Sequence, residues 1–354
     1  MKSVLITGIT GQDGAYLAKF LLSKNYDVYG TYRRLSTPNF WRLGHLEILD
    51  KVKLIPADVY DTTSLLEALI TSDATEVYNL AAQSFVGSSF DQPIYSSEID
   101  GITPIKILEV IRQTNNDIRF YQASTSEMFG DNAPCPQDED TVFLPSSPYA
   151  AAKLFAYHII RIYRESYGIF ASNGILFNHE SPIRGLEFVT RKISNSVARI
   201  KLGLQKYLCL GDLNAKRDWG YAPEYVEAMW KILQHNEPDD FVVASGETHS
   251  VIEFAEAAFN VVGLKSEGYV RTDDIYKRPN EVYLLQGNPS KIKKKISWQP
   301  KTKFTELVKL MVEADIHRWE RYLKGELFHW DAFNYPYDIQ VVKRKIRKDP
   351  KLFG

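Results

Sequence analysis

Four side chains near the middle of the chain have the types and the spacing for proton and hydride chemistry. Tyr149 and Lys153 are four residues apart, so on a helix they share one face. The ammonium can then lower the pKa of the phenol from about 10 toward the working pH and make a usable base. Thr125 and Glu127 add a hydroxyl and a carboxylate. A carboxylate beside the tyrosine could remove a carbon-bound proton next to a new carbonyl, which makes elimination of water possible.

The N-terminal segment has the pattern of a dinucleotide-binding unit. An apolar run at residues 4–7 leads into Gly8, Gly11 and Gly14, and an amphipathic helix follows. Gly8 permits a tight turn, Gly11 lets backbone N–H groups approach a pyrophosphate, and Gly14 allows close helix–strand packing. The spacing is G-x-x-G-x-x-G rather than G-x-G-x-x-G. Its place at the first strand–helix junction favours a cofactor site over a purely structural turn.

The residues after the next strands indicate which cofactor binds. A predicted strand at residues 27–32 ends about 20 residues past the glycines, where an NAD site usually has an acidic residue. Here the chain has Arg33 and Arg34, which favour the 2′-phosphate of NADP; the alternative is an exposed arginine pair. Asp58, after a predicted strand at residues 52–55, is placed to accept from the adenine amino group. The small residues of 80–84, after a strand at 76–79, let the nicotinamide half pass close to the backbone.

Longer stretches carry a resemblance to a known family. They are GITGQDGAYLA from Gly8, RRLS from Arg33, NLAAQSFV from Asn79, FYQASTSEMFG from Phe120, SPYAAAKLFAY from Ser147, NGILFNHESP from Asn173, FVTRKIS from Phe188 and AKRDWG from Ala215. Through them the chain resembles the extended short-chain dehydrogenases/reductases, and within these the GDP-mannose 4,6-dehydratase family. NHESP, FVTRKIS and Thr-Ser-Glu are much more specific than Tyr-x-x-x-Lys. The resemblance runs from residue 8 to about residue 300.

The resemblance implies an activity and the roles of the central residues. Tyr149 would take the proton of the C4 hydroxyl of GDP-D-mannose as hydride leaves C4 for NADP. Glu127 would remove the C5 proton and protonate the departing C6 hydroxyl, with Thr125 donating to the C4 oxygen and Lys153 holding the nicotinamide ribose. Return of the hydride to C6 and protonation of C5 by Tyr149 would give GDP-4-keto-6-deoxy-D-mannose without net redox change.

The motifs and the resemblance together predict the binding residues. For NADP they are Gly8, Thr10, Gly11, Gln12, Asp13, Gly14, Arg33, Arg34, Ser36, Asp58, Val59, Leu80, Ala81, Ala82, Ser84, Tyr95, Lys153, His179 and Arg184. For the GDP-sugar they are Ser84, Glu127, Tyr149, Asn178, Val189, Lys192, Arg217, Arg278 and Glu281. The residue types are suitable, because a diphosphate needs Arg and Lys donors and guanine needs a carboxylate or amide opposite its N1–H and N2 amino groups. The seven histidines show no ligand spacing, so no metal site is predicted.

Alternating strand and helix patterns predict the fold class. They favour an α/β fold with a Rossmann-type doubly wound parallel sheet. We expect residues 1–177 to form the NADP-binding domain, and the chain to return to the sheet of that domain near residues 220–245. Residues 178–324 are expected to form most of an interleaved, smaller substrate-binding lobe. Residues 325–354 are a C-terminal extension unlike the family, rich in aromatic residues and then in Lys and Arg. We expect it to dock on the body or on a neighbouring subunit, with disorder as the alternative.

Composition narrows the function classes. The 354 residues are 44% hydrophobic, enough for a large core, and the net charge of -1 offers no general attraction for nucleic acid. Two cysteines are too few for a disulfide framework and favour a reducing compartment. The chain enters its first strand without room for a signal peptide, and no apolar stretch approaches the about 18 residues of a membrane span. We therefore expect a cytoplasmic enzyme. The resemblance implies that it forms a homodimer or homotetramer.

Three departures from the family leave alternatives open. Ile183 stands where the family commonly has a first arginine before Arg184, and residues 37–44 replace a more polar stretch that in the family helps to join subunits. Phe85 replaces a histidine near the expected sugar site, so a related GDP-sugar such as a GDP-manno-heptose is an alternative substrate. A nucleotide-sugar epimerase or reductase is less favoured, since Glu127 would have no task. A non-catalytic NADP-sensing scaffold would have no need for all four central residues.

Overall fold

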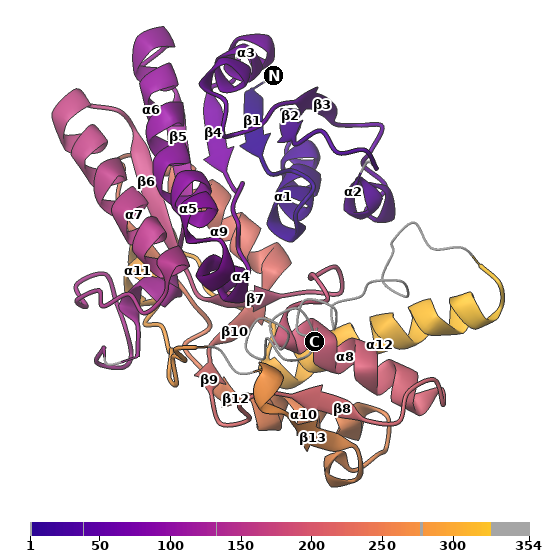
Figure 1. Ribbon diagram of the computed structural model, residues 1–354. Coiled ribbons are helices and arrows are strands. Elements are labelled where there is room, and N and C mark those ends of the chain that lie inside the picture. Colours follow the sequence, from indigo (N-terminus) through magenta and orange to yellow (C-terminus); the bar gives the residue numbers. More distant parts are fainter. Residues whose placement is uncertain (1, 38, 132, 277–278, 327–354) are drawn as a thin grey trace, which may run out of the picture.

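A seven-stranded parallel sheet forms the larger lobe (Figure 1). The computed structural model describes residues 2–37, 39–131, 133–276 and 279–326. The strands, in spatial order, are β11 (Phe241–Val243), β6 (Ala171–Leu176), β5 (Arg119–Thr125), β4 (Glu76–Asn79), β1 (Ser3–Thr7), β2 (Asp27–Tyr32) and β3 (Lys53–Pro56). The chain runs outward in both directions from the β1–β4 junction, which is the switch point of a doubly wound sheet. The predicted fold class is confirmed.

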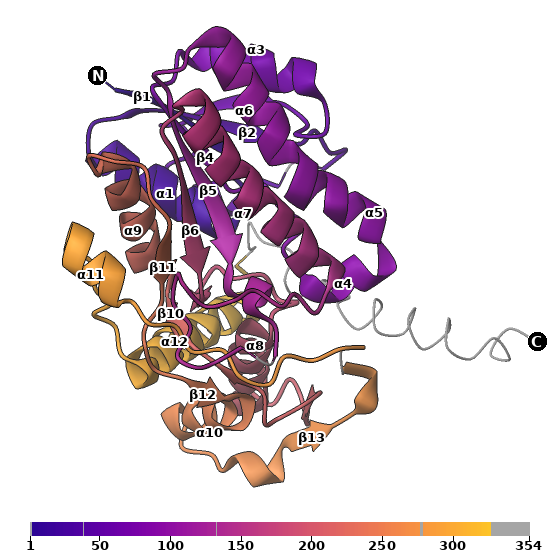
Figure 2. The same ribbon diagram turned by 90° about the vertical axis from the view of Figure 1, so that its left-hand side faces the viewer.

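Helices cover both faces of this sheet (Figures 1 and 2). One face packs against α1 (Gln12–Ser23), α2 (Trp41–His45) and α9 (Ala222–Gln234). The other packs against α3 (Thr62–Ser72), α6 (Thr103–Thr114) and α7 (Pro148–Tyr167). Both faces are therefore apolar, and β4 and β6 are buried at every position, as parallel strands of this kind require. Shorter turns complete the lobe: α4 (Val86–Asp91), α5 (Pro93–Ser96), the π-helix η1 (Ser97–Ile102) and the 3₁₀ helix η2 (Ser126–Phe129).

The smaller lobe has its own apolar core. Its helices are α8 (Val189–Lys201), α10 (Val251–Val261) and α12 (Phe304–Leu323), with the 3₁₀ turns η3 (Ser266–Gly268) and η4 (Asp274–Tyr276). Its paired strands are β7 (Asn178–Glu180) with β10 (Trp219–Tyr221), β8 (Leu208–Leu210) with β13 (Val270–Thr272), and β9 (Lys216–Arg217) with β12 (His249–Ser250). A capping box between Ser250 and Glu253 begins α10.

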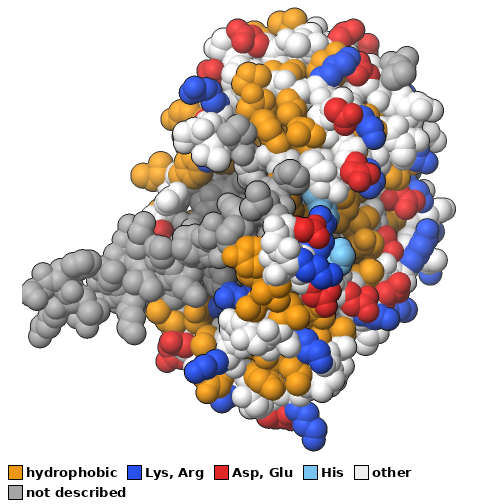
Figure 3. Space-filling view, turned by 90° about the vertical axis from the view of Figure 1, so that its right-hand side faces the viewer, with side chains coloured by type: hydrophobic (Ala, Val, Ile, Leu, Met, Phe, Trp, Pro, Cys, Tyr) orange, Lys and Arg blue, Asp and Glu red, His pale blue; other side chains and the backbone are white. Residues whose placement is uncertain are grey.

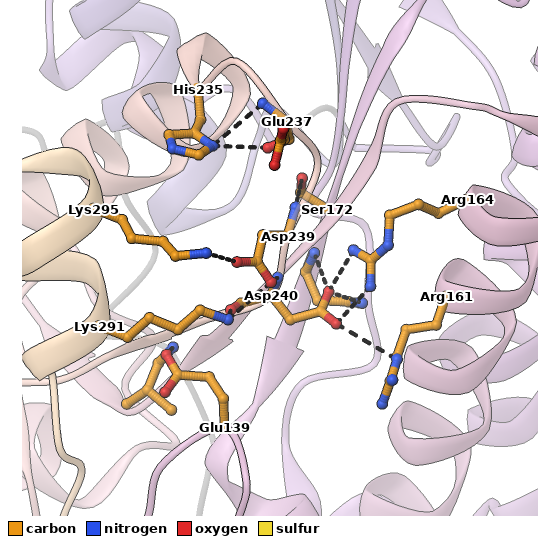
Figure 4. Close-up of polar contacts among 12 residues, drawn as sticks. Glu139, Arg161, Arg164, Ser172, His235, Glu237, Asp239, Asp240, Lys291 and Lys295 are labelled. Atoms are coloured by element: carbon orange, nitrogen blue, oxygen red, sulfur yellow. Dashed lines mark hydrogen bonds and ion pairs between the residues drawn. The ribbon is translucent and has the colours of Figure 1, made fainter.

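The segment after β13 crosses back to the larger lobe. Residues of α11 (Ser290–Ile296) lie within the range expected in the smaller lobe, yet Ile292 and Trp298 pack into the core beside α1 and α9. Figure 4 shows the polar contacts that hold this return in place. Asp239 accepts from Lys291 and Lys295 at 2.8 Å each, while Asp240 accepts from Arg164 of α7. No helix among the described residues is long and apolar enough to cross a membrane.

Candidate active site

A cavity of about 410 Å³ opens at the carboxyl ends of the central strands, where a doubly wound sheet binds its ligand. It brings together these predicted cofactor residues: Gly8, Thr10, Gly11, Gln12, Asp13, Gly14, Arg33, Asp58, Val59, Leu80, Ala81, Ala82, Ser84, Tyr95, Lys153, His179 and Arg184. Arg34 and Ser36 are exposed and do not line it. Sequence reasoning missed other lining residues, among them Thr31, Tyr32, Ala57, Ile99, Ser124 and Phe188. Thr31, Tyr32, Ala57 and Ile99 are ordinary strand or core residues for which the sequence offers no signal, whereas Ser124 and Phe188 lie within stretches that carry the resemblance.

The glycine turn has the close contacts that a phosphate cradle requires. Gly8 has a φ of +70°, and a Cβ there would lie 2.8 Å from the Ala81 nitrogen, so another residue would displace the 80–84 loop. Thr7 Oγ1 accepts from the backbone N–H groups of Leu80 and Ala81, both at 3.1 Å, and so fixes that loop beside the turn. Gly11 begins α1 without a side-chain cap. The first-turn N–H groups and the positive end of α1 therefore face the cavity, as an anion site needs.

The end of the first cavity that is expected to hold adenosine is lined by charged and aromatic side chains. Arg33 Nη1 donates to the hydroxyl of Tyr95 at 2.8 Å and so spans this end of the cavity. Asp58, the expected partner of the adenine amino group, lines the same wall, and its Oδ1 accepts from the N–H of Tyr60 at 3.0 Å. These contacts leave the planar guanidinium of Arg33 at the rim, where it can meet a phosphate.

The four central residues meet at one buried point. Thr125 ends β5 and Glu127 lies in η2, while Tyr149 and Lys153 lie in the first two turns of α7. Pro148 and the Ser147 cap, which accepts from the N–H of Ala150 at 3.1 Å, begin α7 at the position that aims Tyr149 into the cavity. The exposed fractions of Thr125, Glu127, Tyr149 and Lys153 are 9%, 7%, 7% and 3%, so water has little access to any of them. Lys153 Nζ donates to the Ala123 carbonyl at 3.1 Å.

The electrostatics of Tyr149 differ from the expectation. Burial raises the pKa of its phenol above the ordinary value, and the carboxylates of Asp100 and Glu127 raise it further. Hydrogen bonding with Thr125 and the charge of Arg184 act in the opposite direction. The net shift is upward because burial dominates, and the Lys153 ammonium lies 3.7 Å from the carboxylate of Asp100. Asp100 is a buried acid that sequence reasoning missed; its only signal is an aspartate inside an apolar stretch, Ile-Asp-Gly-Ile.

A second cavity, of about 190 Å³, adjoins the first and contains the remaining predicted substrate residues. Asn178, Val189, Lys192, Arg217 and Glu281 line it; Arg278 lies outside the described residues. Residues that the sequence analysis did not single out complete the lining, among them Glu180, Glu187, Thr190, Asp212 and Tyr276.

Two contacts organise the side chains of this second cavity. Arg217 Nη2 donates to Glu281 Oε1 at 2.9 Å, and Lys192 Nζ lies 3.3 Å from the ring centre of Tyr276. The cations and the carboxylate expected to meet a nucleotide diphosphate therefore lie together in the smaller lobe. Among the described residues, no His, Cys, Asp and Glu side chains form a group of three or more that could hold a metal ion.

Aromatic rings mark the junction of the two cavities. Phe85, Asn178 and Phe188 line both of them. The rings of Phe85 and Phe188 meet edge to face with centres 5.9 Å apart, and the guanidinium of Arg184 lies 3.6 Å from the centre of the Phe188 ring. A ligand that extends from one cavity into the other must pass this pair, which gives the junction an apolar wall.

Comparison with known proteins agrees with this architecture. A family profile described as GDP-mannose 4,6 dehydratase matches residues 5–311. The GDP-mannose 4,6 dehydratase of Homo sapiens is 50% identical over 337 residues, covering 88% of this chain and 91% of that protein. The GDP-mannose 4,6-dehydratase of Yersinia enterocolitica is 43% identical over 352 residues, covering 90% and 95%.

Solved structures with lower identity share the fold. RMD from Pseudomonas aeruginosa, complexed with NADPH, superposes with a TM-score of 0.74 at 21% identity and covers 90% of this chain and 100% of that one. The dTDP-glucose 4,6-dehydratase of Bacillus anthracis, in complex with NAD, gives 0.79 at 19% identity and covers 92% and 100%. The family match spans both lobes and both cavities, and on that basis this chain belongs to the GDP-mannose 4,6-dehydratase family.

Proposed function

We propose that this protein is an NADP-dependent hydro-lyase that converts GDP-D-mannose to GDP-4-keto-6-deoxy-D-mannose. The observation that carries the proposal is the position of Glu127, a buried carboxylate beside Tyr149 at the inner end of the dinucleotide cavity. An epimerase or reductase that only moves a hydride needs the tyrosine but has no use for this acid. The names of the relatives, GDP-mannose 4,6 dehydratases at 43–50% identity, support the same activity.

The cofactor proposed for the larger cavity is NADP. The glycine turn and the uncapped start of α1 fit a pyrophosphate, and Lys153 fits a ribose hydroxyl near the site of chemistry. The choice of NADP over NAD rests on Arg33 at the cavity rim and on exposed Arg34 beside it. When bound, the nicotinamide ring supplies the acceptor, and later the donor, of one hydride.

The residues of this chain would carry the proton transfers. Tyr149 takes the proton of the C4 hydroxyl after its own phenol has ionised, and Thr125 donates a hydrogen bond to the resulting C4 carbonyl oxygen. Glu127 takes the C5 proton, made acidic by that carbonyl, and delivers it to the C6 hydroxyl, which leaves as water. Tyr149 then returns its proton to C5. One water is lost, and both side chains end in their starting protonation states.

The second cavity is the proposed site of the GDP moiety. Lys192 and Arg217 would donate to the diphosphate, and Glu281 or Asn178 would accept from guanine. The hexose would then lie at the junction beside Phe85 and Phe188, within reach of Glu127 and Tyr149. Arg278 is retained as a proposed diphosphate ligand on the resemblance alone.

The proposed partners are small molecules and further copies of the chain. On the face drawn in Figure 3, the described Lys and Arg side chains are interspersed with Asp and Glu, so the described part of that face has no uniform positive field for nucleic acid. A homodimer or homotetramer is proposed, supported by Phe155 and Ile162, which are seven residues apart on α7 and 44% and 50% exposed. α7 lies on the outside of the larger lobe (Figure 2). Cys135 and Cys209, both free thiols, support a cytoplasmic location.

Incubation of the purified protein with GDP-mannose and NADP⁺, followed by mass spectrometry, tests the activity. We expect loss of one water from the sugar nucleotide without accumulation of reduced nicotinamide, because the hydride returns to the sugar. Isomerisation without loss of water would instead support an epimerase. Water loss from a GDP-manno-heptose alone would support the alternative substrate, for which the replacement of histidine by Phe85 at the junction is the specific observation.

A further inference from the structure

A second buried acid lies directly behind the catalytic tyrosine and lysine. Asp100 is 1% exposed and lies in η1, a π-helical turn between α5 and α6. Its carboxylate is 3.7 Å from Lys153 Nζ, and its Oδ1 accepts from the N–H of Gln83 at 3.1 Å. Gln83 belongs to the loop that lines the dinucleotide cavity next to the glycine turn. Asp100 therefore connects three pieces of the site that are far apart in sequence: the cofactor loop, the π-helical turn and the start of α7.

One oxygen of this carboxylate has no hydrogen-bond partner. Asp100 Oδ2 is buried and unsatisfied among the described residues, which is unusual for a charged group in an apolar interior. A proton on that oxygen would remove the cost of burying the charge. Consistently, burial raises the pKa of Asp100 to about 7, although the charge of Lys153 and the N–H of Gln83 act in the opposite direction.

The pKa of Lys153 is likewise set by burial and by the charge of its partner, Asp100. Burial lowers the pKa of its ammonium, and the charge of Asp100 opposes that effect. Its Nζ also donates to the Ala123 carbonyl at 3.1 Å, so the ammonium lies between a carbonyl and a carboxylate. Because the two groups are close and buried, protons leave the pair in steps that belong to both residues.

The surroundings of Asp100 contain few other charges. Among the described residues, two side chains of α7 interact electrostatically with the Asp100 carboxylate. The charge of Lys153 lowers the pKa of Asp100, and the carboxylate in turn raises the pKa of Tyr149. The cofactor loop offers only the neutral N–H of Gln83, and α5 has no charged residue. Lys106 of α6 is paired with Glu98 at 3.6 Å.

We propose that Asp100 is a positioning residue that holds the Lys153 ammonium and can carry a proton on its unpartnered oxygen, so that the pair, not Lys153 alone, sets the charge facing Tyr149. The inference rests on the proposed dehydratase for its kinetic test only. Asp100 lines neither cavity, and it acts through Lys153 and Tyr149, which line the first one.

Asp100→Asn provides the kinetic test. The amide keeps the size of the side chain and an oxygen for the Gln83 N–H, but it removes the negative charge. Since Asp100 raises the pKa of both Tyr149 and Lys153, both limbs of the pH profile of kcat should move to lower pH, by about 1–3 pH units for a charge at this distance. A purely structural role would lower kcat and thermal stability and leave both limbs in place, which would refute the proposal.

Asp239→Asn is the matched control. It removes a carboxylate that pairs with Lys291 and Lys295 near the amino end of β6, outside both cavities (Figure 4). We expect its pH profile to coincide with that of the wild type. Equal displacement in both variants would show a general effect of charge and would also overturn the assignment to Asp100.

Infrared spectroscopy tests the proton directly and needs no turnover. In protein labelled with ¹³C-aspartate, Asp100 and Asp218 should both contribute carboxylic-acid C=O signal at pH 6, and the part from Asp100 should be lost with a midpoint near pH 7. Asp100→Glu moves this carboxyl out of the labelled set, so the part that titrates near pH 7 should vanish, while the signal of Asp218, whose pKa burial raises to about 6, should persist. A labelled band unaffected by Asp100→Glu would refute the proton-holding role.

These two arms separate the proposals. If the wild type removes no water from any GDP-sugar yet the band titrates, then the proposed activity fails and the Asp100–Lys153 pair stands. If water is lost but the band is absent and the profile of Asp100→Asn is unmoved, the activity stands and this inference fails.

Discussion

His179 lies between two hydrogen-bond acceptors and must therefore carry a proton on each ring nitrogen. Its Nδ1 is 2.7 Å from the Phe177 carbonyl, and its Nε2 is 2.8 Å from the Asp13 carboxylate. Neither partner can donate when Asp13 is ionised, so the ring is an imidazolium. The pair joins α1 of the larger lobe to β7 of the smaller one, at the phosphate end of the cavity. The two lobes are thus linked by a partly buried ion pair that lines the first cavity.

The stability contributed by this pair should depend on pH. Burial raises the pKa of Asp13, but the charge and hydrogen bond of His179 outweigh it and bring the pKa down to about 2. Burial lowers the pKa of His179, but Asp13 outweighs it, so the net shift is upward. Stability from the lowered carboxyl pKa is present above the unfolded value of about 4 and is lost as pH falls toward 2. Stability from the raised imidazole pKa is complete below about 6.5 and is lost as pH rises through the folded value.

His179→Gln should therefore destabilise the protein most between about pH 4 and pH 6.5. Glutamine can still donate to Asp13 but has no charge. We expect a cost of about 1 kcal/mol in that window, the order of a partly exposed ion pair beyond the hydrogen bond that glutamine keeps, and a smaller cost at alkaline pH. Thermal melts of both proteins across pH measure the difference. A difference that stays constant from pH 5 to pH 9 would show that the ring is not charged in the folded state.

Glu127→Gln should separate the two halves of the proposed reaction. The amide keeps the shape of the site but cannot take the C5 proton. We expect water loss to fall about 10²–10⁴-fold, the usual contribution of a general base, while oxidation at C4 continues and reduced nicotinamide accumulates. Mass spectrometry and nicotinamide absorbance follow the two steps in one sample. Equal loss of both steps, with NADP binding intact, would assign Glu127 to positioning rather than to proton transfer.

Arg33→Ala should weaken the binding of NADP but not that of NAD. A guanidinium at the adenosine end gains its charge-assisted bonds only with the 2′-phosphate, so we expect the Kd for NADP to rise about tenfold or more. Titration of nicotinamide fluorescence with the reduced cofactors gives both constants. Arg112→Ala is the control, because Arg112 lies on the outer surface of α6 and pairs with Glu109. Equal weakening for both cofactors would contradict a role in NADP selection.

Asp315→Asn should unfold the smaller lobe more easily. Asp315 is completely buried and accepts from Arg191 and Ser194 of α8 and from Arg318 of α12. Loss of its charge leaves two buried guanidinium groups facing each other, which typically costs about 3–5 kcal/mol. Urea unfolding followed by tryptophan fluorescence measures the change, since Trp319 lies on α12. The double variant Arg191→Met with Asp315→Leu should recover part of the lost stability. If neither Asp315→Asn nor this double variant changes the urea midpoint of unfolding, the cluster does not stabilise the lobe.

The elements with strong local patterns could be predicted from the sequence. The predicted strands at residues 27–32 and 76–79 coincide with β2 and β4. The strand predicted at residues 52–55 lies one position later, as β3, because an alternating pattern defines a strand better than its ends. The glycine turn, the dehydratase motifs and most lining residues of the first cavity were likewise predictable, since each lies in a continuous stretch whose chemistry can be read locally.

The sequence by itself determined the fold class, the family and the types of side chain available for chemistry, because periodicity, glycine spacing and short motifs are properties of neighbouring residues. Tertiary structure decided the electrostatics. Asp13 meets His179 across 166 positions, and Asp100 meets Lys153 across 53, only because the doubly wound topology brings their elements to the same end of the sheet. The raised pKa of Tyr149 and the return of α11 to the larger lobe also depend on which surfaces become buried together. Burial is a property of the whole packed chain, and so no local pattern could have indicated that Tyr149 and Lys153 operate as part of a larger buried set with Asp100.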